Sequence, residues 1–384
     1  MILNIGPSHP ATHGALQIIL ELDGETIIKA DPIIGYLHRG VEKLAEDLTY
    51  HQFVPYTDRL NYVSSFLNNV GYVMAVEKLV GMEVPERAQV IRVILSELSR
   101  IMDHFVCLGA NVVDLGAFTP FLYMFYAREK AYDIFEEVCG ARLTVSYARV
   151  GGVAKDLPEG FEEKILALCD LTESTMKDVA GLLNKNRIFI DRTVGVGVIS
   201  QEDAISYGFT GPNLRATGKQ WDIRKAFPYL TYDRYDFEIP TRDGGDIWSR
   251  YSVRLEEITQ SVRIIRQALK DLPSGRFISD DFKHVLPDKT EVYDNMEGLI
   301  HHFEQIIHGV RPPKGEVYAS VEAASGELGY YLVSDGGRSP YRLRIRPPCM
   351  IYYQALEEMI KGHLVADLVG VLGSINVVAG ELDR

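Results

Sequence analysis

The chain has 384 residues, 46% of them hydrophobic, so it can bury a large core as one large domain or two interlocked domains. It carries 40 basic against 53 acidic residues, a formal net charge of −13. Because no run of Lys and Arg is present to follow a phosphate backbone, the composition argues against nucleic-acid binding. The four cysteines lie far apart without a CxxC pair, which argues against a disulfide framework and a sequence-local zinc or iron–sulfur site. This cysteine usage indicates a reducing compartment.

Membrane insertion and export are both disfavoured by the sequence. No charged and then apolar leader precedes Asn4, so a signal peptide is not expected. The most apolar segment, 362–380, is interrupted by Asp367, Asn376 and several glycines. Since a membrane span needs roughly 20 mostly apolar residues, a buried helix is the better interpretation of this segment.

The sequence opens with the loop GPSHPATHG, residues 6–14, in which His9 and His13 are four positions apart. On a helix this spacing would place both imidazoles on one face. Pro10 removes a backbone donor and disfavours the helical conformation of the residue before it, so we expect a rigid extended loop. A metal would need a third ligand nearby. The spacing alone leaves a metal site, a catalytic site and a simple turn as alternatives.

Elements with clear periodicity follow the loop. A β-hairpin is expected over 15–30, because two β-rich runs flank Asp23-Gly24. Two long amphipathic helices are expected over 62–80 and 87–108, because apolar residues recur there at helical spacing. Four further segments have a helical period, namely 121–138, 160–184, 253–269 and 352–372.

Short β-type runs complete the pattern at 193–199, at 232–239 and in a meander over 317–346. The sequence therefore predicts an α+β, mainly α protein: a bundle of long helices with an N-terminal β-hairpin and a small C-terminal antiparallel sheet. We expect an N-terminal α/β segment, 1–55, that carries the hairpin and the opening loop. A helical bundle with inserted short strands, 56–384, forms one interlocked unit with it.

Three polar features interrupt otherwise apolar elements. The first is the opening loop, and the second is TDRLNYVSSF, which would start a helix with Asp58, Arg59 and Tyr62 near its N-terminus, where backbone donors converge. The third is Asp114, which lies among apolar residues before a Gly/Pro break that should end the second long helix. A buried aspartate must be paired or protonated, and a histidine is its natural partner. The ordinary alternatives are a core aromatic for Tyr62, a helix-end cap for Asp114 and a loop residue for His13.

Long runs of this sequence resemble, in order and spacing, the D subunit of respiratory complex I, the NADH:quinone oxidoreductase. The similarity extends from Asn4 to Arg384. The runs are GPSHPATHG, GYLHRGVEKLAE, PYTDRLNY, LGAFTPFLYMFYAREK, GARLTVSYARVGGVAKDLP, NRIFIDRTVGVGVIS, QWDIRK, YLVSDGGRSPYRLRIRPP and the terminal GELDR.

That family in turn resembles the large subunit of nickel–iron hydrogenases, which holds its metal with an RxCGxC motif and a DPCxxC motif. In this chain Asn61 and Ser64 stand at the cysteine positions of the first motif, and Val378 and Glu381 at those of the second. Nickel–iron chemistry needs soft thiolate ligands. The resemblance therefore implies a vacated metal pocket, with no metal held by this chain.

In the complex I family the corresponding cavity takes the quinone headgroup. The resemblance implies that His13 and Tyr62 bind the quinone and act catalytically as its proton donors, with Asp114 as the partner that orients His13 and favours its protonated form. If His13 gave up its proton, Asp114 would remain as a poorly solvated anion, which we expect to relay reduction towards proton pumping.

Two further positions matter in this resemblance. His38 and Arg39 are expected near the side that faces an iron–sulfur cluster, although a hydrogen-bonded structural role fits them equally well. Many relatives read DRLDY where this chain reads DRLNY, so Asn61 lacks a carboxylate beside Tyr62.

The resemblance also implies cofactors and partners. Quinone is the substrate, its electrons come from a [4Fe–4S] cluster in the neighbouring B subunit, and NADH and FMN belong to a distal electron-input module. This chain itself is expected to bind no cofactor. Its expected partners are the B, C and I subunits and the membrane-embedded H subunit, at the periphery of the cytoplasmic side of the cell membrane. The alternatives are a relative fed by ferredoxin or a deazaflavin, a membrane-bound nickel–iron hydrogenase subunit, and a purely structural scaffold.

Overall fold

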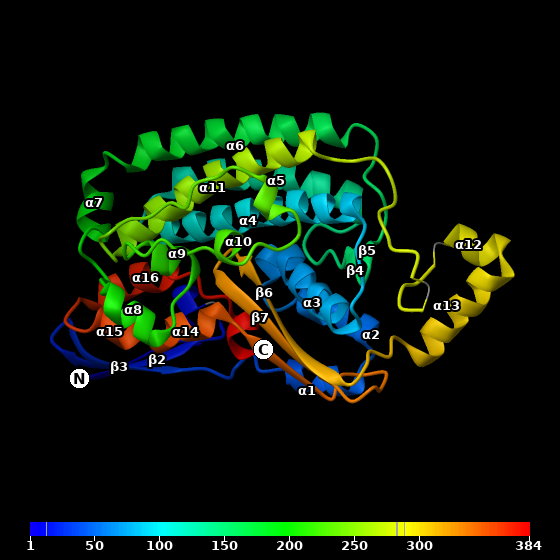
Figure 1. Ribbon diagram of the computed structural model, residues 1–384. Helices are drawn as coiled ribbons and strands as arrows, with labels where there is room; N and C mark the ends of the chain where they lie inside the picture. The colour runs from blue at the N-terminus through cyan, green and yellow to red at the C-terminus, as the bar shows by residue number, and fades with distance from the viewer. Residues whose placement is uncertain (13, 282, 288) are drawn as a thin grey trace.

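The structure is a computed structural model that describes residues 1–12, 14–281, 283–287 and 289–384. Four long helices form a bundle at one side of the molecule (Figure 1). They are α4 (Glu86–Asp114), α5 (Phe118–Cys139), α6 (Phe161–Leu183) and α11 (Ile247–Lys270). Helix α4 packs against α5 and α11, and α6 packs against the same two helices. Because α4 is buried on nearly every face, it forms the centre of the main core.

The long helices lie where the periodicity predicts them, and α4 ends at Asp114 as expected. Gly116 adopts a φ of 91°, in the left-handed region that glycine favours beyond a helix C-terminus. The amide of Ala117 closes the turn by donating to the carbonyl of Val112 at 2.7 Å. Before α4, a 3-10 turn (Tyr62–Ser64) leads into α3 (Ser65–Val80).

The single helix expected over 352–372 is wrong. The segment is divided into three short helices, α14 (Pro348–Gln354), α15 (Leu356–Ile360) and α16 (Val365–Ser374). The break after α15 has a structural cause, because its backbone pairs with the N-terminal hairpin. The Gly362 amide donates to the Ile27 carbonyl at 2.8 Å, and the Ile27 amide donates to the His363 carbonyl at 2.9 Å.

The strands expected at 193–199 and 232–239 are also wrong. Thr193 is the last residue of α7 (Arg187–Thr193), and a 3-10 turn (Tyr232–Arg234) begins the second segment. The extended chain that follows finds its hydrogen-bond partners on a helix. The amides of Asp236 and Glu238 donate to the side chains of Gln267 and Gln260 of α11, at 2.9 and 3.0 Å. Glutamine side chains thus replace the neighbouring strand that the β-type pattern had suggested.

Two three-stranded antiparallel sheets lie below the bundle in Figure 1. They contain the hairpin and the meander that the sequence predicts, and the first also contains β1, which was not predicted. The N-terminal sheet has the order β1-β2-β3 and consists of β1 (Ile2–Ile5), β2 (Gln17–Asp23) and β3 (Thr26–Ile33). The C-terminal sheet has the order β6-β7-β8 and consists of β6 (Gly315–Ala323), β7 (Gly326–Ser334) and β8 (Arg342–Arg346). Helix α3 packs on β6 and β7, while α15 packs on β3.

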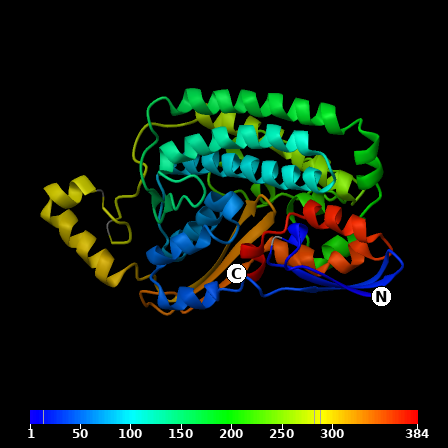
Figure 2. The ribbon, with the colours of Figure 1, turned by 180° about the vertical axis from the view of Figure 1, so that it is seen from behind.

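Shorter elements connect these parts. They are α1 (Val41–Asp47), α2 (Tyr50–Thr57), β4 (Ala148–Arg149), β5 (Gly152–Val153), α8 (Gln201–Tyr207), α9 (Gly211–Arg215), α10 (Ile223–Ala226), α12 (Lys289–Asp294), α13 (Met296–His308) and α17 (Ala379–Asp383). Helices α12 and α13 project from one end of the molecule (Figure 2). Among the described residues, no helix combines the length and apolar character needed to span a bilayer.

The opening loop is not fully extended, which corrects the expectation for this segment. Residues 10–12 form a 3-10 turn, in which Pro10 occupies the first position. A proline is tolerated there because its missing amide has no partner within the turn. Thr12 holds the turn, since its hydroxyl donates to the His9 carbonyl at 2.8 Å. This turn packs against α16.

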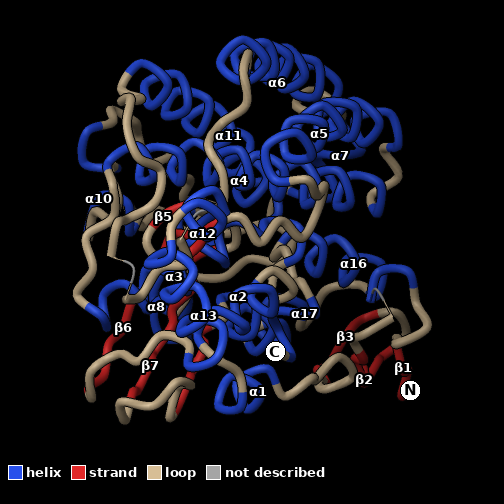
Figure 3. The backbone as a smooth tube through the Cα atoms, turned by 90° about the vertical axis from the view of Figure 1, so that its right-hand side faces the viewer, coloured by secondary structure: helices blue, strands red, loops and turns tan. Residues whose placement is uncertain are grey.

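Four chain segments thus converge at one end of α4. The C-terminal half of α4 lies against the turn Tyr62–Ser64 and against α16, and the opening turn touches α16 from another side. Figure 3 shows α16 and α17 close to the N-terminal sheet at this side of the molecule. Residues from both ends of the chain therefore meet at a single place.

Candidate functional site

A cavity of about 170 Å³ lies where these segments converge. Tyr62 enters it from the 3-10 turn, Ala110 and Asp114 from α4, and Gly373 and Asn376 from the C-terminal segment. Two residues that the sequence singled out, Tyr62 and Asp114, therefore line the same cavity. His13 lies outside the described residues.

Tyr62 is positioned by the residue before it. Asn61 caps the 3-10 turn, because its side-chain oxygen accepts hydrogen bonds from the amides of Val63 and Ser64 at 3.2 and 3.3 Å. The ring of Tyr62 remains 40% exposed at the cavity. Burial raises the pKa of Tyr62, and the negative charge of Asp103 raises it further. The phenol therefore keeps its proton at neutral pH and can act as a donor.

Asp114 is exposed in the single chain. The expectation that this aspartate is buried is therefore wrong for the chain without its partners. The reason is its place as the last residue of α4, where Gly116 turns the chain away. Its carboxylate nevertheless lies at the cavity that also contains Tyr62. A group at the cavity rim can face a bound molecule or a neighbouring chain.

The four positions compared with hydrogenase cysteines are all buried, and one of them, Val378, lines this cavity. Asn61 is fully buried, and its amide nitrogen donates to Asp103 at 3.0 Å. Asn376, from the C-terminal segment, donates to the other oxygen of the same carboxylate at 2.7 Å. The carboxylate missing at position 61 is therefore present beside Tyr62 after all, supplied by α4.

Glu381 occupies another of these positions and is also buried. Burial raises its pKa to about 7, although the carboxylate accepts a hydrogen bond from the Cys349 amide at 3.1 Å. Burial likewise raises the pKa of the Cys349 thiol, and the nearby Glu381 adds to this effect. A thiol that stays protonated is a poor metal ligand.

The donor set does not fit a nickel–iron centre. Asn61, Ser64, Val378 and Glu381 offer no thiolate. Within the described parts of the chain, no three side chains of His, Cys, Asp or Glu gather closely enough to hold a metal ion.

His38 and Arg39 tie the C-terminus to the segment before α1. A ring nitrogen of His38 lies 2.7 Å from the carbonyl oxygen of Asp383. Arg39 donates to the carbonyls of Arg59 and Gly380 at 2.9 and 3.1 Å. The structural role of both side chains is thus visible, while their position facing an iron–sulfur cluster stays a prediction.

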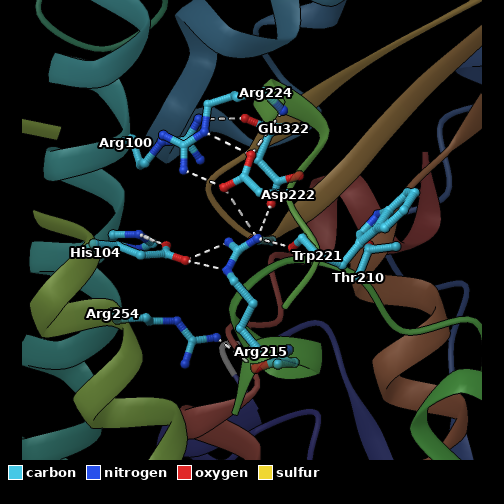
Figure 4. Close-up of polar contacts among 12 residues, drawn as sticks. Arg100, His104, Thr210, Arg215, Trp221, Asp222, Arg224, Arg254 and Glu322 are labelled. Carbon is cyan, nitrogen blue, oxygen red and sulfur yellow. Dashed lines mark hydrogen bonds and ion pairs between the residues drawn. The ribbon is translucent and has the colours of Figure 1, made fainter. Parts of the chain in front are cut away.

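A buried network of charged side chains joins α4 to α11 and β6, and the sequence did not reveal it (Figure 4). Arg215 is its centre, donating to Glu257 at 2.7 Å and to Glu322 at 2.8 Å. A second centre is Arg224, which pairs with Asp222 at 2.6 Å and with Glu97 at 3.1 Å. A usable signal existed, because Glu97, Arg100 and His104 follow i, i+3, i+7 spacing and so share one face of the helix. Charged residues on the buried face of a helix must be paired.

Two further buried arginines, Arg250 and Arg254 of α11, hold the C-terminal segment beside the cavity. Arg254 donates to the Ser374 carbonyl at 2.7 Å, and Arg250 donates to the Ser374 hydroxyl at 2.9 Å. His104 joins the network with its Nε2 at 2.8 Å from Glu257. Burial lowers the pKa of His104, so the ring is neutral at pH 7 and donates from Nε2. Arg250 and Arg254 thus anchor Ser374, two residues before Asn376 at the cavity.

Comparison with known proteins defines the class of this protein. A family model described as "Respiratory-chain NADH dehydrogenase, 49 Kd subunit" matches residues 114–384. A protein of Geotalea uraniireducens that is named as the D subunit of NADH-quinone oxidoreductase is 54% identical over 384 residues, which cover 100% of this chain and 98% of that protein. The D subunit of Myxococcus xanthus is 51% identical over 100% of this chain and 92% of its own length. A protein of Bdellovibrio bacteriovorus that is named as the C/D subunit is 54% identical over 100% of this chain and 68% of that protein.

These matches place the chain in an oxidoreductase complex, as one of its subunits. The chain belongs to the family of the respiratory-chain NADH dehydrogenase 49 Kd subunit, which is the D subunit of NADH-quinone oxidoreductase. The family expected from the sequence motifs is confirmed.

Proposed function

We propose that this chain forms the quinone-headgroup site of a proton-translocating NADH:quinone oxidoreductase, at its contact with the iron–sulfur protein of the complex, the B subunit. The observation that carries the proposal is the meeting of Tyr62 and Asp114 at one cavity. Its volume of about 170 Å³ suits a single ring, since a protein cavity of about 150 Å³ binds benzene.

The side chains at the cavity suit the chemistry of quinone reduction. Forming a quinol consumes two electrons and two protons, and the doubly reduced headgroup is a strong base. Tyr62 supplies one proton from a phenol whose pKa is raised by burial. His13 supplies the other, with Asp114 as the partner that favours its protonated form. Both electrons come from a [4Fe–4S] cluster of the B subunit. That cluster receives them from NADH by way of FMN in the distal module.

Several observations support this assignment over the alternatives. The names of the relatives specify NADH, which favours NADH over ferredoxin or a deazaflavin as the electron donor. The lack of thiolates at the four compared positions argues against hydrogenase chemistry, and we propose that the cavity descends from a hydrogenase-like metal pocket. The relative named as a C/D subunit supports the C subunit as a partner. The B and I subunits and the membrane-embedded H subunit complete the proposed surroundings, at the cytoplasmic face of the cell membrane.

Filling the cavity tests the proposed function. Ala110 lines it from α4, so Ala110→Phe is expected to lower kcat/KM for quinone by about tenfold or more, because the added ring occupies the space of the headgroup. NADH oxidation by ferricyanide, a hydrophilic acceptor that needs no quinone cavity, should be unchanged. Ala167→Phe, on the exposed face of α6, is the matched control. Normal quinone kinetics in Ala110→Phe would contradict the proposal.

Asp114 carries the proposed link to proton pumping. Because it is exposed in the chain alone, the link requires that neighbouring subunits cover it in the complex. In Asp114→Asn, no uncompensated anion can form when the histidine loses its proton. We therefore expect proton translocation to fall at least as much as quinol formation, measured as the ratio of protons moved to NADH oxidised in vesicles. A mutant with normal pumping would eliminate this role.

A further inference from the structure

Asp103 connects three of the chain segments that line the cavity, namely α4, the turn at Tyr62 and the C-terminal segment. It lies on α4 and is 1% exposed. One of its carboxylate oxygens accepts from the Asn61 amide at 3.0 Å, and the other accepts from the Asn376 amide at 2.7 Å. Asn376 also donates to the Ser325 hydroxyl at 3.1 Å and thereby reaches the turn between β6 and β7. We call this arrangement of Asn61, Asp103 and Asn376 the amide clamp.

The amide clamp fixes the orientation of both asparagines. The oxygen of Asn61 is used by the amides of Val63 and Ser64, so its nitrogen must face Asp103. Asp103 supplies a separate acceptor oxygen to each of the two amide nitrogens. Because a carboxylate accepts on both oxygens, it can hold both amides at once, whereas a single amide side chain has only one acceptor oxygen.

Tyr62 is therefore held by a chain of two contacts. Asp103 fixes Asn61, and Asn61 fixes the start of the 3-10 turn that carries the tyrosine. From the other side, Asp103 fixes Asn376, which lines the cavity opposite. On the basis of the proposed function, we propose that Asp103 is a positioning residue for quinone reduction. It sets the distance between Tyr62 and the C-terminal wall of the cavity through its two asparagine partners.

The clamp also places one negative charge near the phenol. Burial is the largest cause of the raised pKa of Tyr62, and Asp103 is the next. Among the described residues, the other titratable groups that face this region are Cys349 from α14, Glu381 from α17, and Cys107, His104 and Asp114 from α4. Removing the charge of Asp103 should lower the pKa of Tyr62 and shift the alkaline limb of the activity profile to lower pH.

The clamp predicts that positions 61 and 103 can exchange their side chains. Asn61→Asp alone would place two carboxylates at about 3.0 Å, where they repel or must share a proton. Asp103→Asn alone would leave two amides competing for one acceptor oxygen. In the double exchange, the side chain at position 61 still caps the turn, since Asp is as good a cap as Asn. The amide at position 103 can then donate to that carboxylate and accept from Asn376.

The experiment compares the four forms in the assembled complex. Each single variant is expected to lower kcat/KM for quinone about tenfold or more, with kcat falling more than KM rises, because a displaced donor acts in the reacting state. The double variant should recover to within about threefold of wild type. In Asp103→Asn the alkaline limb of the activity profile is expected to move to lower pH. This movement should be absent when Tyr62→Phe is also present. NADH oxidation by ferricyanide reports a working electron-input module, and the amount of this subunit in the purified complex reports assembly. Asp178→Asn on the exposed face of α6 controls for loss of one carboxylate.

Two outcomes overturn the role of Asp103 while the proposed function stands. One is wild-type quinone kinetics in both single variants, and the other is a double variant no better than the poorer single variant. The proposed function has its own separate test in Tyr62→Phe. Full quinone reduction in that variant would overturn the proposed function, and the positioning role with it.

Discussion

Tyr62→Phe is expected to lower quinone reductase activity of the assembled complex by about 100-fold or more, because a positioned general acid contributes roughly 10² to 10⁴ to a rate. The substitution removes one oxygen and leaves the ring, so the cavity keeps its apolar wall. The capping of the turn by Asn61 does not involve the phenol and should persist. The effect should therefore appear in kcat far more than in the amount of complex.

The measurement is quinone-dependent NADH oxidation across a range of pH. Burial and Asp103 both raise the pKa of Tyr62. The phenol of the wild-type protein should therefore lose its proton, and activity should fall, only at a pH above the usual pKa of tyrosine. Tyr62→Phe should abolish that limb. Tyr126→Phe is the matched control, because this tyrosine is 59% exposed on α5. Equal activity in both variants would show that the phenol of Tyr62 donates no proton to quinone.

The fold class and part of the site could be predicted from helical periodicity and from turn residues. Helical periods gave the long helices, and Gly116 correctly marked the end of α4 at Asp114. Spacing alone could not show that Tyr62 and Asp114 share a cavity, since a tight bundle must first bring α4 beside the turn Tyr62–Ser64. Only the family resemblance linked them before the structure did.

What the sequence missed depends on contacts between distant segments. Asp103 reads as one more polar residue of an amphipathic helix until Asn376 is known to lie beside it. The segments 193–199 and 232–239 have β-type sequences, but neither needs a neighbouring strand. Gln260 and Gln267 bond the backbone of the second segment, and in the first the Ile199 amide donates to the Gly245 carbonyl. Tertiary context overrides local preference in both cases.

Glu97→Gln is expected to destabilise the chain by about 3–5 kcal/mol, the usual cost of breaking a buried ion pair by removing one partner. The side chain of Glu97 is fully buried. Its carboxylate accepts from Arg224 at 3.1 Å, from the Tyr232 hydroxyl at 2.7 Å and from the Ser261 hydroxyl at 2.6 Å. Neutralising it removes the main counter-charge of Arg100 and one of the two carboxylate partners of Arg224, which keeps Asp222.

The measurement is equilibrium unfolding of the purified chain in urea, followed by far-UV circular dichroism. Glu129→Gln is the matched control, because this carboxylate pairs with Arg142 on the exposed side of α5 and the unfolding midpoint should hardly change. An equally small change in Glu97→Gln would mean that its arginine partners are compensated by other groups.

The same carboxylate predicts a pH dependence of stability with a definite sign. Burial alone would raise the pKa of Glu97, but Arg100 and Arg224 outweigh it and hold the pKa at about 2, below the usual 4.5. A carboxyl whose pKa is lower in the folded state contributes stability above its unfolded pKa and loses it as pH falls through the folded one. Wild-type stability should therefore decline between about pH 4.5 and pH 2, and Glu97→Gln should decline less over that window.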